Sequence, residues 1–135
     1  MTKASLIISY DDNISRGKEQ FMRAFLHSLG YDHVFVFRRR YPNKTEKVLE
    51  KYNDLVPEDV EVKYDDVLVV PPANGRYVSG FLKVLRNLLE ITFDNVWVPE
   101  FNGRTIDGFY TMFGEYEEVN SDDVKAHEEY DEEVK

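Results

Sequence analysis

Short apolar runs alternate with longer amphipathic stretches along most of this chain. Runs rich in Val, Ile, Phe and Tyr between Asp, Asn, Gly or Pro are typical of strands, whereas apolar residues three and four apart indicate helices. We expect strands at 5–10, 33–38, 60–64, 67–70, 96–98 and 116–119, and helices starting near residues 14, 46, 76 and 106. This order predicts an α/β protein in which helices flank a mixed central sheet.

The helix that starts near Arg76 has the clearest apolar stripe. Its predicted core positions are Val78, Phe81, Leu82, Leu85, Leu88 and Leu89, which recur at helical spacing. The strand at 67–70 is apolar throughout, so we expect it to be buried on both faces. Gly30 follows the first helix, where a left-handed residue is common.

Charge divides the chain into two parts. The protein has 135 residues and a net charge of −9, and residues 115–135 carry ten acidic side chains and two lysines, a balance of −8. Residues 120–135 also lack an apolar face. We therefore predict a single α/β domain at 1–119 and an acidic tail at 120–135.

Composition also bears on compartment and partners. The chain has no cysteine, which excludes disulfides and thiolate metal sites, and it has no apolar run of the length that a membrane span needs. These features favour a cytoplasmic protein that does not enter a membrane. The acidic tail opposes direct nucleic-acid binding and suits a protein partner, in particular a basic one.

Two charged clusters suggest other chemistry. Asp11 and Asp12 end the first predicted strand, where carboxylates can hold Mg²⁺. The predicted strand at 67–70 is followed by Pro71-Pro72 and adds no carboxylate. The three histidines lack a metal-ligand spacing. We therefore predict no metal site and expect Asp12 or Asn13 to cap the following helix.

The sequence Arg38-Arg39-Arg40 is the one basic cluster. Guanidinium groups match phosphate oxygens, so this cluster is a candidate site for phosphate or nucleic acid. Neutralisation of the acidic tail and a solvated strand end are the alternatives.

The segment VVPPANGRYVSGFLKVL joins a buried strand to a helix, and Asn102, Thr105-Ile106, Tyr110 and Gly114 follow the next strand. This order resembles the second half of GNAT-type N-acyltransferases, in which coenzyme A phosphates lie at the start of that helix. The resemblance covers 66–119 and implies a GNAT-like mixed sheet. It also implies cofactor contacts from Val70, Asn74, Gly75, Arg76, Tyr77, Val78 and Asn102.

The same resemblance implies catalytic roles. Tyr110 matches the tyrosine that protonates the leaving thiolate, and Glu100, or a water molecule, would be the base. Tyr110 is equally interpretable as a core aromatic residue. Tyr77 and Ser79 stand where the family favours glycine, which favours a protein without strong catalysis.

Three functional hypotheses follow. The first is a GNAT-like scaffold that acts through protein contacts, of the kind found among small viral accessory proteins. The second is an active acyltransferase that uses acetyl-CoA. The third is an inhibitor whose acidic surface mimics nucleic acid.

Overall fold

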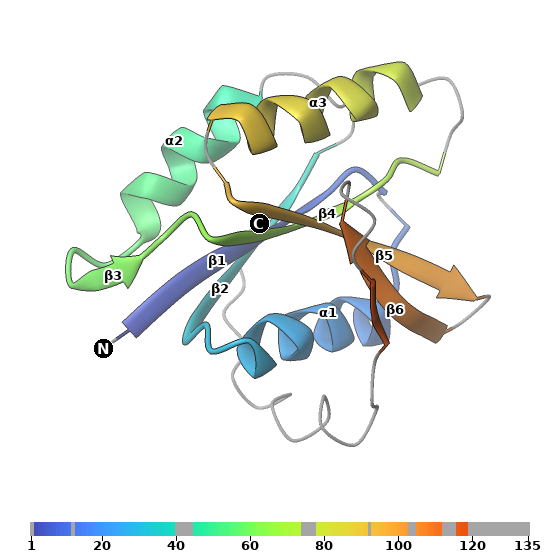
Figure 1. Cartoon of the computed structure of the whole chain (residues 1–135), viewed down its shortest axis with the longest axis horizontal. Helices are drawn as coiled ribbons and strands as arrows, with labels where there is room; N and C mark the ends of the chain where they lie inside the picture. The colour runs from blue at the N-terminus through green and yellow to red at the C-terminus, as the bar shows by residue number, and fades with distance from the viewer. Residues whose placement is uncertain are drawn as a thin grey trace.

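Four parallel strands form the centre of the sheet, and an antiparallel hairpin extends it at one edge (Figure 1). The computed structural model describes residues 2–11, 13–39, 45–73, 78–91, 93–102, 105–111 and 116–118. The strand order is β2-β1-β4-β5-β6-β7, and the short β3 pairs with the start of β1. The elements are β1 Thr2–Ser9, α1 Arg16–Ser28, β2 His33–Arg38, α2 Thr45–Leu55, β3 Val60–Val62, β4 Asp66–Val70, α3 Val78–Ile91, β5 Asn95–Asn102, β6 Thr105–Thr111 and β7 Tyr116–Glu118.

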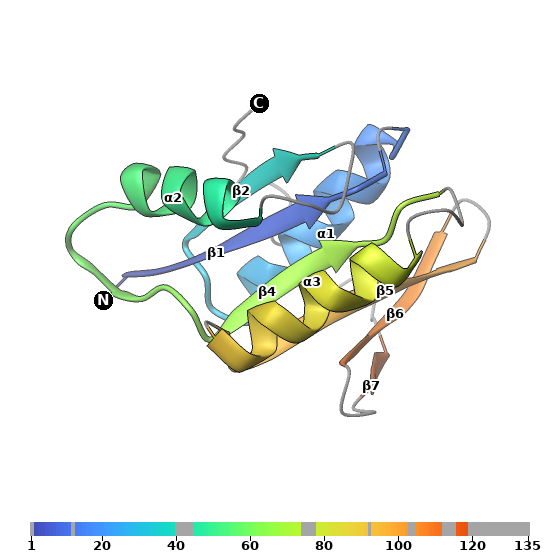
Figure 2. The ribbon, with the colours of Figure 1, turned by 90° about the horizontal axis from the view of Figure 1, so that it is seen from above.

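The helices lie on opposite faces of the sheet. α1 covers one face, and α2 and α3 cover the other, as the two perpendicular views show (Figures 1 and 2). β2, β1, β4 and β5 are parallel, whereas β6 and β7 are antiparallel to their neighbours. The predicted mixed α/β architecture with flanking helices is therefore confirmed. No helix among the described ranges has the length and apolar character needed to cross a membrane.

The core has two halves, one on each face of the sheet. Along β4, Val67 and Val69 belong to the cluster under α2 and α3, whereas Leu68 and Val70 belong to the cluster under α1. All four side chains are fully buried. The prediction that this strand is covered on both faces is confirmed, because helices pack on both faces of the sheet and β4 lies inside it, between β1 and β5.

The ends of α1 are set by local hydrogen bonds. The Ser15 side chain caps the helix by accepting a hydrogen bond from the Lys18 backbone N–H at 3.2 Å. The expected capping by Asn13 is wrong, because α1 begins at Arg16 and the N-cap position falls on Ser15, two residues after Asn13. Asp12 lies outside the described residues. At the other end, Gly30 has φ 103°, so the predicted left-handed residue is confirmed.

The predicted core stripe of α3 is confirmed in part. Phe81, Leu85 and Leu88 are buried, but Leu82 is 47% exposed, so its predicted core position is wrong. Val84 takes the fourth core position, which centres the buried stripe on one side of the helix. Leu82 lies outside that stripe because one residue turns a helix by about 100°. The side chains of Val78 and Leu89 lie outside the described part.

The helix predicted to start near residue 106 is wrong, because β6 occupies Thr105–Thr111. β6 pairs with β5 from Trp97 opposite Thr111 to Asn102 opposite Thr105. The sequence TIDGFYT is rich in β-branched and aromatic residues and contains a glycine, all poor choices for a helix. The predicted strand at 116–119 is present as β7, which pairs with β6.

Candidate functional site

The parallel strands bring their carboxyl ends to one edge of the sheet. The Arg39 N–H donates to the Ser9 carbonyl at 2.8 Å, and the Tyr10 N–H donates to the Val70 carbonyl at 3.0 Å. The ends of β2, β1 and β4 are therefore tied side by side. The chain leaves β1 and β4 toward opposite faces of the sheet, and in open α/β sheets ligands bind beyond the strand ends at such a switch point.

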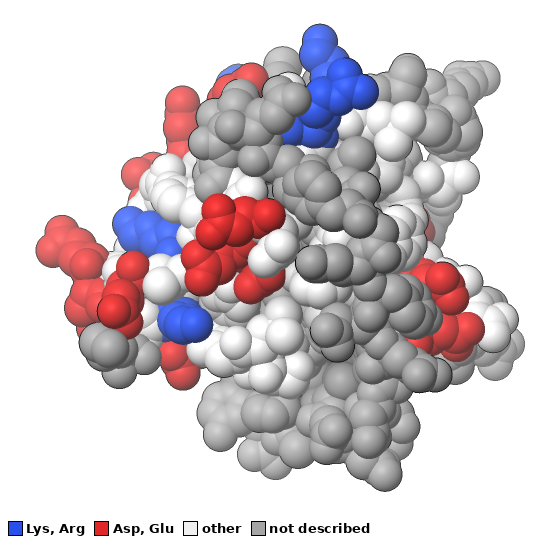
Figure 3. Space-filling model, viewed as in Figure 1, with Lys and Arg blue, Asp and Glu red and all other residues white. Residues whose placement is uncertain are grey.

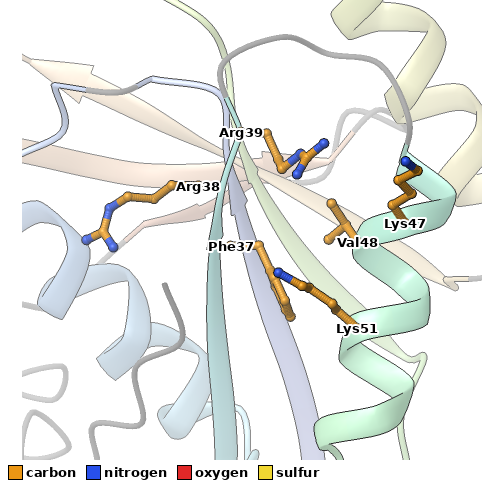
Figure 4. A pocket seen from close by; sticks show the side chains of 6 residues that line it. All are labelled: Phe37, Arg38, Arg39, Lys47, Val48 and Lys51. Atoms are coloured by element: carbon orange, nitrogen blue, oxygen red, sulfur yellow. The ribbon is translucent and has the colours of Figure 1, made fainter.

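A basic pocket lies beside this edge, between the end of β2 and α2 (Figure 4). Its volume is about 210 Å³. The lining consists of Phe37, Arg38, Arg39, Lys47, Val48 and Lys51. Four of these six residues are cationic and none is acidic, so the pocket has the character of an anion site.

Two adjacent arginines, Arg38 at the end of β2 and Arg39 directly after it, lie on opposite sides of the sheet (Figure 4). Arg38 points toward α1, whereas Arg39 lies on the α2 side (Figure 4). The Arg38 guanidinium forms an ion pair with Glu19, a carboxylate that also binds the buried Arg23 at 3.2 Å. Arg39 is therefore the arginine that faces the side of Lys47 and Lys51.

Helical spacing supplies the other two cations. Lys47 and Lys51 are four residues apart in α2, so they lie one above the other on the same side of the helix. They flank Val48, which is buried against the sheet and holds this side of α2 next to β2. Among the described residues, Arg39, Lys47 and Lys51 form no ion pair.

α2 is fixed in place by Tyr52. Its ring is fully buried and meets Phe35 of β2 edge to face, with ring centres 6.1 Å apart. Its hydroxyl donates to the Lys63 carbonyl at 2.8 Å. Burial raises the pKa of this hydroxyl above its ordinary value, so it stays a donor at neutral pH. The wall that carries the two lysines is thus anchored before any ligand arrives.

The surrounding surface is mixed in charge. On the face seen in Figure 3, described acidic side chains gather in several groups, and described lysines and arginines form smaller, separate ones. The whole chain has 26 acidic and 17 basic side chains. Because acidic side chains outnumber basic ones, the positive charge of the pocket comes from the few cationic residues that line it and not from the net charge of the protein.

The predicted cofactor residues fall into three groups. Val70 ends β4, where it is fully buried on the α1 face, so its side chain contributes packing. Asn74, Gly75, Arg76 and Tyr77 lie outside the described residues, as does the side chain of Val78, the first residue of α3. Asn102 is exposed at the end of β5 and leads into a hairpin, not into the helix that the resemblance implies.

The predicted catalytic pair lies on the β5–β6 hairpin. Glu100 is exposed opposite Gly108, and Tyr110 is 41% exposed opposite Val98. Strand alternation places Glu100 and Tyr110 on the α3 face as diagonal neighbours, a relation that typically separates Cβ atoms by about 7–8 Å. β1 and β4 lie between this hairpin and the basic pocket, so the two groups of residues form separate sites.

Asp11 makes a local turn. Its side chain accepts a hydrogen bond from the Asn13 N–H at 2.9 Å. Within the described residues, His, Asp and Glu side chains form no cluster able to hold a metal ion.

Lys47 and Lys51 were not singled out by the sequence, although Arg39 was. Two lysines four apart in a helix usually lie in solvent, and only the packing of α2 against β2 brings them to Arg39. The available signal was their spacing on either side of the apolar Val48.

Comparison of the chain with protein-family models, with curated proteins and with solved structures found no match.

Proposed function

We propose that this protein is a ligand-binding α/β domain that holds a phosphate group in the pocket between β2 and α2. One observation carries the proposal: Arg39, Lys47 and Lys51 meet at a pocket, and none of the described residues that line it is acidic. Guanidinium and ammonium groups form charge-assisted hydrogen bonds with phosphate oxygens, and these are about twice as strong as neutral ones. The position beside the carboxyl edge of a parallel sheet supports a ligand site as well.

Thermal unfolding of the full chain with inorganic phosphate tests this function. A ligand that binds only the native state adds about 1.4 kcal/mol at ten times its dissociation constant, so the melting temperature should rise by several degrees. Chloride at the same ionic strength should not produce the rise. The double variant Lys47→Gln/Lys51→Gln should lose it, whereas Lys83→Gln, on the exposed side of α3, should keep it. No rise in the unmodified protein would refute the proposal.

Acyl transfer is a second candidate, supported by the exposure of Glu100 and Tyr110 on one face of the hairpin. Here the resemblance to GNAT-type enzymes gives the roles: Tyr110 as acid, Glu100 or a water molecule as base, and acetyl-CoA as donor. We expect weak acetyl-CoA binding, because Tyr77 replaces a glycine in the corresponding loop. If transfer to amines is detected, Tyr110→Phe should lower turnover more than binding. Equal turnover would remove Tyr110 from the mechanism.

A protein partner stays a prediction. The acidic residues 120–135 on which it depends lie outside the described part of the chain. The same holds for nucleic-acid mimicry.

A further inference from the structure

Among the described residues that line the pocket, the polar side chains are donors only. Arg39 offers five N–H groups, Lys47 and Lys51 offer three each, and none of the three can accept a hydrogen bond. A protonated phosphate oxygen would direct its O–H at groups that cannot accept it. The pocket therefore favours an anion that has lost all its acidic protons.

The positive charge of the pocket exceeds what a single negative charge neutralises. Arg38 is already paired with Glu19 on the other face, so it adds little to the balance. The carboxylates of Glu46 and Glu50 on α2 are exposed and lie outside the lining. In sequence, the connection 40–44 between β2 and α2 contains one arginine, one lysine and no acidic residue.

We propose that the ligand presents a terminal phosphate monoester, an inference that rests on the proposed function. A monoester dianion has three free oxygens, which match three cationic side chains arriving from two elements. A phosphodiester has two free oxygens and one negative charge, and a carboxylate has the same. Either would leave a cation of the pocket without an anionic partner.

The size of the pocket places the rest of the ligand outside it. A volume of about 210 Å³ lies below the roughly 300–1,000 Å³ of pockets that enclose a whole small molecule. The pocket thus receives the phosphate and the atoms next to it.

Methyl phosphate and dimethyl phosphate form a matched pair of probes that differ by one methyl ester. Titration of the full chain, followed by amide NMR shifts, should give at least tenfold tighter binding of methyl phosphate at pH 7.5. Lys47→Gln/Lys51→Gln should abolish this preference, and Lys83→Gln should retain it. Equal affinities for the two probes in the unmodified protein would overturn the monoester inference.

Acidification provides a second measurement. A phosphate monoester has a second pKa near 6, so lowering the pH from 7.5 to 5 should weaken methyl phosphate binding about tenfold. Sulfate stays a dianion over this range, so its affinity controls for any change in the charge of the protein itself and should stay constant. Parallel pH profiles for the two anions would contradict the inference.

The two proposals fail in different ways. If neither methyl phosphate nor sulfate binds, the phosphate-binding function is wrong. If both bind but dimethyl phosphate binds equally well, the function stands and the monoester preference is wrong. If methyl phosphate binds more tightly than dimethyl phosphate, both proposals stand. Glycerol 3-phosphate and a phosphoserine peptide then show, by which binds more tightly, whether the monoester belongs to a small molecule or to a polypeptide.

Discussion

At the scale of single residues, two leucines of α3 provide a direct test of packing. Leu85 is 3% exposed and Leu82 is 47% exposed, although both belong to the apolar stripe of the sequence. Leu85→Ala should reduce the free energy of unfolding by about 2–5 kcal/mol, since a buried side chain is lost and a cavity remains. Leu82→Ala should change it by about 0.5 kcal/mol or less. Urea unfolding of both variants measures the difference, and equal losses would contradict the placement of α3.

The role of a residue could be predicted from the sequence where its own chemistry or its immediate neighbours decide that role. Gly30 was predicted because a left-handed turn favours glycine. Arg39 was a candidate phosphate ligand because guanidinium groups match phosphate oxygens. Lys47 and Lys51 escaped prediction, because their role depends on a neighbour that is eight or more residues away in sequence and belongs to another element. Leu82 was misplaced since the sequence stripe is wider than the surface that the sheet can cover.

At the scale of elements, Glu19 joins α1 to the end of β2. Its carboxylate is buried and binds both Arg23, which is 2% exposed, and Arg38. Glu19→Gln keeps the shape but removes the negative charge that Glu19 places beside both arginines, and breaking a buried ion pair costs about 3–5 kcal/mol.

Denaturant unfolding of Glu19→Gln should therefore show a large loss of stability. Glu50→Gln, on the exposed side of α2, is the matched control and should have almost no effect. A loss no greater than that of the control would show that the buried pair does not hold α1 against β2.

Strands bounded by clear turn residues were predicted well, and β6 shows why one element was not. Ile106, Phe109, Tyr110 and Phe113 are three and four residues apart in the sequence, which is the spacing of an apolar helical face. Two tertiary contacts favour the strand: β6 pairs with β5 along its length, and Phe109 stacks on Phe25 of α1 with ring centres 3.9 Å apart. The signal for a hairpin was Asn102-Gly103, a typical turn between strands.

At the scale of the whole molecule, two buried tyrosines make stability depend on alkaline pH. Burial raises the pKa of both Tyr31 and Tyr52, and for Tyr31 a hydrogen bond to Asp66 adds to the effect. Unfolded tyrosine titrates near pH 10, so above this pH the unfolded chain loses protons that the native state retains. Their contribution is complete below pH 10 and is lost as the pH rises further.

The free energy of unfolding should therefore fall above pH 10, by up to about 1.4 kcal/mol per pH unit for each tyrosine. Urea unfolding from pH 9 to 11 measures this slope. Tyr52→Phe should make it shallower, although the variant starts less stable because the Lys63 carbonyl loses its donor. An unchanged slope in Tyr52→Phe would show that this hydroxyl ionises equally in both states.

The order of strands in the sheet was not readable from the sequence. The alternation of strands and helices predicts an α/β protein, but nothing in the apolar pattern states that β4 lies next to β1. That arrangement follows from crossover connections that place α1 on one face and α2 on the other. It also creates the edge at which Ser9, Arg39 and Val70 meet.

The central place of β1 has a consequence for biosynthesis. β1 precedes every strand that pairs with it, and its partner β4 ends 61 residues after β1 does. At about 5–20 residues per second, a ribosome needs roughly 3–12 s to make that interval. During this time Leu6, Ile7 and Ile8, all fully buried in the finished protein, have one flank open. We expect nascent chains that stop before residue 66 to be held by chaperones, and those that extend past α3 to be released.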